Sequence, residues 1–141
     1  MKNKLFINFI IFVIICLSSN LKAETIFFDS KNIKIEENGN MIFATKGQAK
    51  IPSNNLILEG DKFIYDKINS ELIVIDNVKY FDNENNIYIE SNKIIYNEIN
   101  NTIFSKSDTY IKSDDDYEIN SIDVLYDRNL NKILSNKYTS V

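Results

Sequence analysis

The chain has 141 residues, of which 20 are acidic and 16 basic, for a formal net charge of −4. This length suggests one domain with a core of modest size. The acidic balance and the lack of a basic cluster argue against a nucleic-acid partner, since nucleic acids are bound by basic surfaces. The sequence has no histidine and a single cysteine, Cys16, so the usual general bases, thiol nucleophiles and zinc ligands are missing and catalysis is not expected.

Residues 1–23 differ from the rest of the chain and have the plan of a secretory signal peptide. Lys2 and Lys4 precede an apolar run, 5–17, and Ala23 offers a small residue for cleavage. The apolar run is shorter than the ~20 residues that a membrane-spanning helix needs. The sequence therefore predicts export of a mature domain that comprises residues 24–141.

Two alternatives to a cleaved signal remain open. Leu21 is not ideal at the third position before the cut, and an uncleaved membrane anchor is the first alternative. A lipoprotein modified at Cys16 is the weaker alternative, because isoleucines precede Cys16 where small residues are wanted.

Without residues 1–23 the chain has 13 basic and 20 acidic residues, a net charge of −7, and no cysteine. Such a chain has no disulfide framework, so its stability depends on burial and hydrogen bonding.

The rest of the chain repeats a unit of about 30 residues, a length that indicates stacked supersecondary units. An acidic or amide anchor residue ends the same apolar segment in each unit, and successive anchors are 30, 31 and 30 residues apart. A small residue lies six positions before each anchor. The anchors are Glu36, Asp66, Asn97 and Asp127, the residues before them are Ile35, Tyr65, Tyr96 and Tyr126, and the small residues are Ser30, Gly60, Ser91 and Ser121.

Each unit contains two alternating apolar runs joined by a polar turn, which is typical of a β-hairpin. The Asn-Gly pair at Asn38 is a strong hairpin signal, and Pro52 begins the loop that closes the first unit. The small residue of each unit predicts a corner at which the strand bends or bulges. No helical stripe persists over three turns, so the fold is predicted to be all-β. Turns are predicted at 37–40, 67–70, 98–101 and 128–131, and interruptions of the return runs at 46–48, 76–77 and 107–108.

Residues two apart share one face of a strand. The regularly apolar pair at the start of each unit is therefore expected to point inward. Its out-of-phase neighbours, which include Glu59, Glu90, Glu118 and Asn120, are expected to point outward. Beyond the corner both phases are apolar, so the sequence assigns no inward face there. The residues expected to point inward are Ile26, Phe28, Leu56, Leu58, Ile87, Ile89, Tyr117 and Ile119.

The repeated motif resembles the LptA/OstA family, which comprises the periplasmic lipopolysaccharide-transport protein LptA and the N-terminal domain of the outer-membrane assembly protein LptD. Residues 56–62 (LILEGDK) and 47–51 (GQAKI) carry the resemblance, which covers 26–141. The chain departs from the pattern where 76–77 and 107–108 replace a glycine-containing pair. The family's domain normally continues further, so a fragment, or a domain completed by strands of a partner, is expected. LptA and LptD are not distinguished.

The resemblance implies a twisted, V-shaped β-jellyroll built from about four two-strand repeats in a periplasmic protein associated with outer-membrane assembly. It implies head-to-tail addition of edge strands to other jellyroll proteins of a transport bridge. It also implies that the acyl chains of lipopolysaccharide, as lipid A, lie in an apolar groove, without a cofactor or metal ion and without catalysis. The groove-lining residues expected on this basis are Ile26, Phe28, Leu56, Leu58, Ile87, Ile89 and Ile119.

Less specific interpretations of these residues remain open. The same apolar side chains would form the core of any β-sandwich, so an exported structural or adhesive repeat module without a lipid ligand is the alternative function. Glu36 and Glu37 lie beside a tight turn and are expected to be solvated rather than catalytic. Asp114–Asp116 lacks the glycine and distal glutamate of a calcium loop, which favours a solvated turn. For Tyr65, Tyr96 and Tyr126, a cross-strand ladder is favoured over an aromatic rim.

Overall fold

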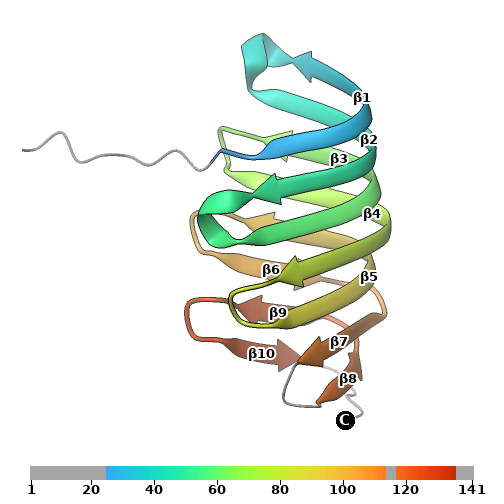
Figure 1. The fold of residues 1–141 in the computed structure, drawn as a ribbon, viewed down its shortest axis with the longest axis vertical. Coiled ribbons are helices and arrows are strands. Elements are labelled where there is room, and N and C mark those ends of the chain that lie inside the picture. Colours follow the sequence, from blue (N-terminus) through green and yellow to red (C-terminus); the bar gives the residue numbers. More distant parts are fainter. Residues whose placement is uncertain (1–24, 114–116, 136–141) are drawn as a thin grey trace, which may run out of the picture.

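The computed structural model describes residues 25–113 and 117–135. Within these residues the chain forms one antiparallel sheet of 10 strands, which stack along the long axis of the molecule from β1 towards β10 (Figure 1). The prediction of an all-β, V-shaped β-jellyroll is confirmed. The predicted signal peptide at 1–23 and the acidic run at 114–116 lie outside the described residues.

The strands that cross the full width of the sheet are β1 (Phe27–Glu36), β2 (Met41–Ile51), β3 (Leu56–Asp66), β4 (Glu71–Asp82) and β5 (Ile87–Asn97). The shorter strands are β6 (Thr102–Ser105), β7 (Thr109–Ser113), β8 (Glu118–Ser121), β9 (Val124–Asp127) and β10 (Lys132–Ser135). Two single-turn 3-10 helices, η1 (Glu37–Gly39) and η2 (Pro52–Asn54), connect β1 to β2 and β2 to β3. The four predicted hairpin turns are confirmed.

The sheet is a single ladder as far as β5 and then divides. Residues 95–97 of β5 pair with β6, whereas residues 87–91 of the same strand pair with β7. From there, β6 continues through β9 to β10, and β7 pairs with β8. The division follows from the predicted interruption at Ser107 and Asp108, because these residues separate β6 from β7.

The long strands bend sharply near their middle, and the bends form a corner along the sheet (Figure 1). The strands do not end at the predicted interruptions 46–48 and 76–77, since β2 and β4 continue through them. The backbone nevertheless deviates there: Asp76 and Asn77 both have positive φ, and the register between β4 and β5 shifts between Ile75 and Val78. A bulge allows one strand to continue through the corner and to pair on both sides of it.

Gly60 shows why the corner needs a small residue. A Cβ atom at this position would lie 2.5 Å from Cγ1 of Val74, on the neighbouring strand. The inward phase also changes here, because Leu58 before the corner and Phe63 after it are both buried although they are an odd number of residues apart. The corner therefore decides which side chains beyond it face the interior.

The two sides of the corner form two walls, which enclose the interior. The first wall consists of residues 26–30, 47–51, 56–60, 78–82, 87–91, 109–113 and 118–121. The second wall consists of residues 32–36, 41–45, 62–66, 71–75, 93–97, 102–105, 124–127 and 132–135. The side opposite the corner, where the turns of both walls lie, is called the mouth below.

One inward side chain from each strand forms a continuous row across each wall. Residues directly opposite in a ladder share a face, so the register defines these rows. The first-wall row is Phe28, Ala49, Leu58, Tyr80, Ile89, Ile111 and Ile119. The second-wall row is Ile35, Ile42, Tyr65, Leu72, Tyr96, Ile103, Tyr126 and Ile133. Tyr65, Tyr96 and Tyr126 lie in this inward row but alternate with Leu72 and Ile103, so they are not direct cross-strand neighbours.

Candidate functional site

The candidate site is the apolar interior between the walls. All of the predicted groove-lining residues belong to it: Leu56, Leu58, Ile87 and Ile89 are buried, and Ile26, Phe28 and Ile119 are half-buried and pack against the core. Their contact with lipid stays a prediction. The expectation for Tyr117 is wrong, because this residue precedes β8 and is 60% exposed.

Sequence reasoning missed the half of the interior that the second wall contributes. Phe63, Tyr65, Ile94 and Tyr96 are buried there, opposite the predicted residues. The tyrosine before three of the four anchors was the available signal, because it recurs with the same spacing as the anchors. Alternation alone did not reveal this half, since residues such as Ile64 and Ile95 are equally apolar and lie on the outer face.

The centre of the interior is filled by side chains from both walls. The ring of Phe28 lies 6.0 Å from the ring of Phe63 and 6.3 Å from that of Tyr65, centroid to centroid. Further along, the rings of Tyr80 and Tyr126 meet edge to face at 6.5 Å. Both of these last tyrosines are completely buried. The walls are therefore in contact across the middle of the molecule.

The β1 end of the interior is open to solvent. Ile33 and Ile35 follow the inward phase, because they pair with Ala44 and Ile42, yet they are 50% and 63% exposed. They are exposed because β1 is the edge strand and has no neighbour beyond it. The interior therefore presents inward-facing aliphatic side chains to solvent at this end.

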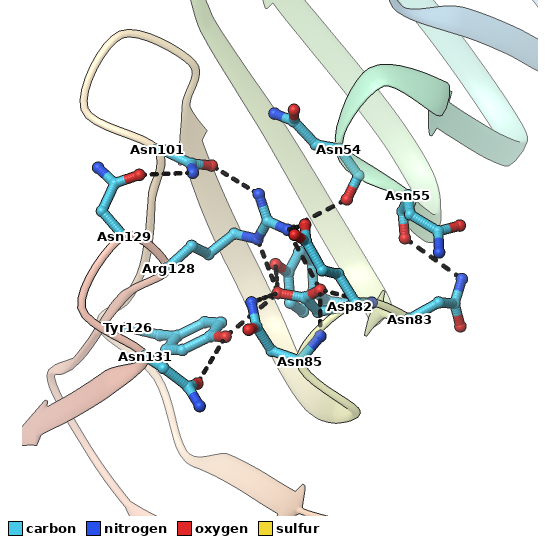
Figure 2. Close-up of polar contacts among 12 residues, drawn as sticks. Asn54, Asn55, Asp82, Asn83, Asn85, Asn101, Tyr126, Arg128, Asn129 and Asn131 are labelled. Carbon is cyan, nitrogen blue, oxygen red and sulfur yellow. Dashed lines mark hydrogen bonds and ion pairs between the residues drawn. The ribbon is translucent and has the colours of Figure 1, made fainter.

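A buried arginine joins the two walls across the mouth (Figure 2). Arg128 belongs to the turn between β9 and β10, on the second wall, and Asp82 ends β4, on the first wall. Nε of Arg128 donates to Oδ2 of Asp82 at 2.7 Å, and Nη2 donates to Oδ1 at 3.2 Å. Nη2 also donates to the carbonyl oxygen of Asn54 at 3.1 Å and to the exposed carboxylate of Glu84 at 3.2 Å, while Nη1 donates to Oδ1 of Asn101 at 2.8 Å. These five residues are called the Arg128 cluster.

The two charges at the centre of the cluster are fully desolvated, with side-chain exposures of 2% for Arg128 and 0% for Asp82. Burial acts to raise the pKa of Asp82, but hydrogen bonds from Arg128 and Asn85 outweigh it and lower the pKa below 3.8. Burial likewise acts to lower the pKa of Arg128, and the bond to Asp82 outweighs it and raises the pKa. Both groups are therefore charged at neutral pH.

Tyrosine hydroxyls extend this polar centre into the interior. The Tyr126 hydroxyl donates to Oδ2 of Asp82 at 3.1 Å, and burial, followed by the charge of Asp82, raises the pKa of Tyr126. The hydroxyl of Tyr80 lies 3.5 Å from the same carboxylate oxygen. The tyrosines are therefore neutral donors that help to satisfy the buried carboxylate.

A hollow of about 670 Å³ lies at the corner, away from the mouth, where the sheet divides. Ser91 and Thr109 line it, and their hydroxyls bond to one another and to neighbouring hydroxyls: Ser91 Oγ is 2.7 Å from Ser105 Oγ and 2.6 Å from Ser107 Oγ. These groups satisfy each other where the bend leaves room only for small side chains. We therefore interpret this cluster as structural.

Among residues 25–113 and 117–135, no group of three histidine, cysteine, aspartate or glutamate side chains is placed to hold a metal ion. No helix in these segments has the length and apolar character to cross a membrane.

The comparisons with known proteins agree with this architecture. No protein-family model matches the chain, and no curated protein matches its sequence. Among solved structures the fold is similar to that of LptH from Pseudomonas aeruginosa, described as the LptA-homologous periplasmic component of the conserved lipopolysaccharide transport device. The TM-score is 0.71 at 10% sequence identity, over 82% of this chain and 84% of that one. The chain thus shares its fold with LptH.

Proposed function

We propose that this protein binds lipopolysaccharide in the periplasm and carries it towards the outer membrane without catalysis. It acts either as an LptA-like element of a transport bridge or as a domain equivalent to the N-terminal domain of LptD. The observation that carries the proposal is the pair of inward apolar rows, which extend from strand to strand, the second-wall row being exposed at the β1 end. The LptH-like fold supports it.

The chemistry of such an interior suits acyl chains. Moving a methylene group from water to an apolar surface is worth about 0.8 kcal/mol, so one long chain contributes on the order of 10 kcal/mol as an upper limit. The sugar and phosphate groups would remain outside the mouth, in water. Because the centre of the interior is filled by side chains, an acyl chain can lie there only when the two walls move apart.

The two ends of the stack suit head-to-tail assembly in a transport bridge. Ile35 on β1 and Ile133 on β10 lie at opposite ends of the same inward row. Addition of the edge strand β1 to the other end of a neighbouring jellyroll would continue that row from one molecule to the next. It would also cover the exposed edge of β1, which is otherwise a risk for aggregation. The partners proposed on this basis are other jellyroll proteins of the bridge.

A second candidate is an exported structural or adhesive repeat module that binds no lipid. The closed centre of the interior favours this candidate, since Tyr80, Tyr96 and Tyr126 are completely buried. A structural module requires such a core and no opening of the walls. The exposed inward residues at the β1 end would then serve self-association only.

Photo-crosslinking with purified lipopolysaccharide distinguishes the two candidates. A benzophenone amino acid replaces Ile35, which faces inward and tolerates a large side chain because it is 63% exposed. The matched control places the probe at the adjacent Lys34, on the outer face of the same strand. Lipid adducts at position 35 and few at position 34 are expected. Equal labelling at both positions, or none at either in folded protein, would overturn lipid binding and leave the structural module.

A further inference from the structure

We propose that the Arg128 cluster is a latch: it holds the mouth shut over β4 to β10 and must open before an acyl chain can occupy that half of the interior. The inference rests on the proposed function and adds a direction to it. Lipid enters the interior at the β1 end and reaches the β10 end only when the latch is open.

The contacts of Arg128 divide into those that cross the mouth and those that do not. Its bonds to Asp82, to the carbonyl oxygen of Asn54 and to the carboxylate of Glu84 reach the first wall. A further bond crosses in parallel, from Nδ2 of Asn54 to the hydroxyl of Tyr96 at 3.0 Å. Opening the mouth at this point requires all of these bonds to break together, as a latch requires.

The two charges keep partners on their own walls when the mouth opens. Asp82 accepts bonds from the backbone N–H groups of Glu84 and Asn85, both at 3.1 Å, and from Nδ2 of Asn85 at 2.9 Å. Arg128 keeps its 2.8 Å hydrogen bond to Oδ1 of Asn101, which lies on the second wall, and its guanidinium group becomes exposed to water. A buried charge without a partner costs several kcal/mol. Opening exposes both charges to water with partners in place, and this makes the latch reversible.

Asp82 and Arg128 differ from the residues found at comparable positions elsewhere in the repeat. Asp82 stands in an inward row where its neighbours in register are Leu56 and Ile87, both buried and apolar. At the position of Arg128, the three earlier units carry Glu37, Lys67 and Glu98, of which the first two are exposed and the third is half-buried. The buried pair is therefore a feature of the last described turn and not of the repeat.

The β1 half has a different kind of contact between its walls. There Phe28 touches Phe63 and Tyr65 through ring contacts, which have no fixed hydrogen-bond geometry to lose. An entering acyl chain can replace such contacts by equivalent apolar ones. The interior is therefore easier to open at the β1 end than at the Arg128 cluster.

The first test measures whether the latch holds the mouth shut in the absence of lipid. Nitroxide labels on Asn83 and Leu130, exposed on turns of opposite walls, report the width of the mouth beside the cluster by double electron–electron resonance. Arg128→Gln is expected to broaden this distance distribution and shift it to longer distances. The control Lys62→Gln removes an exposed ion pair to Asp76 at the corner and is expected to leave the distribution unchanged. An unchanged distribution in folded Arg128→Gln protein would overturn the latch.

The second test holds the mouth shut with a chemical cross-link and leaves the residues of the Arg128 cluster unchanged. The variants Asn83→Cys and Leu130→Cys are combined and joined by a bis-maleimide, and the protein is exposed to palmitate that carries a diazirine at its chain end. Mass spectrometry then locates the labelled residues. Unlocked protein is expected to be labelled at Phe28 and also at Ile103 and Ile111, and locked protein at Phe28 alone.

The outcomes separate the two proposals. Equal labelling of Ile103 in locked and unlocked protein contradicts the latch and leaves lipid binding intact. Absence of label from the whole interior in both forms contradicts the proposed function. The distance measurement on Arg128→Gln still decides the latch in that case, because it uses no lipid.

Discussion

The rings of Tyr80 and Tyr126 meet edge to face with centroids 6.5 Å apart, and each comes from a different wall. The hydroxyl of Tyr126 also donates to Asp82 at 3.1 Å, on the wall of Tyr80. One residue thus joins the walls through both an apolar and a polar contact. The apolar contact holds the interior together, and the polar contact connects it to the Arg128 cluster at the mouth.

These two contributions of Tyr126 can be separated by mutation. Tyr126→Phe keeps the ring contact and loses the hydrogen bonds, so the free energy of unfolding is expected to fall by about 1 kcal/mol. Tyr126→Ala leaves a cavity in the core and is expected to cost about 3–5 kcal/mol. Urea denaturation measures both values. Equal losses for the two variants would show that the ring contact contributes little.

The corner makes Gly60→Ala a destabilising change, although alanine is normally tolerated in a strand. The added Cβ would lie 2.5 Å from Cγ1 of Val74, and relief of such overpacking typically costs about 1–3 kcal/mol. The same substitution made in a Val74→Ala background is expected to cost far less, because the clashing methyl group is absent. A double-mutant cycle measures this coupling, and simple additivity of the two losses would argue against the contact.

The buried ion pair predicts how stability depends on pH. The pKa of Asp82 is lower in the folded protein than its ordinary value of 3.8, so the unfolded chain takes up the proton first. The contribution of Asp82 is therefore present above about pH 4 and is lost as the pH falls through the folded pKa. Asp82→Asn should lower stability at pH 7 and flatten the acid side of the profile, as measured by urea denaturation from pH 7 to pH 3. Parallel profiles for the two proteins would contradict the assignment.

Charge placed on the open β1 end is expected to block association without unfolding the monomer. Ile35→Lys puts a cation into the exposed end of the inward row, where a neighbouring jellyroll would have to bury it. Analytical ultracentrifugation should show a weaker self-association constant and circular dichroism an unchanged strand content. The control Ile68→Lys changes a side chain of similar exposure, 69%, on a hairpin turn. A similar loss of association in both variants would point to a general effect of charge.

The sequence alone determined the period of the fold, the turns and the inward phase of the first wall. These features depend on local chemistry: Asn38 and Gly39 favour a tight turn, and Leu56 and Leu58 alternate with Ile57 and the polar Glu59. The small residue at Gly60 marked the corner for the same reason, since the space for its side chain is limited by the next strand.

Only the tertiary structure decided the second wall and the Arg128 cluster. Beyond the corner Phe63, Ile64 and Tyr65 are all apolar, so the direction of the bend determines which of them face inward. Arg128 and Asp82 are 46 residues apart, in different repeats, and neither is part of the repeated pattern. Their contact exists because the walls face each other across the mouth, a relationship that local periodicity does not encode.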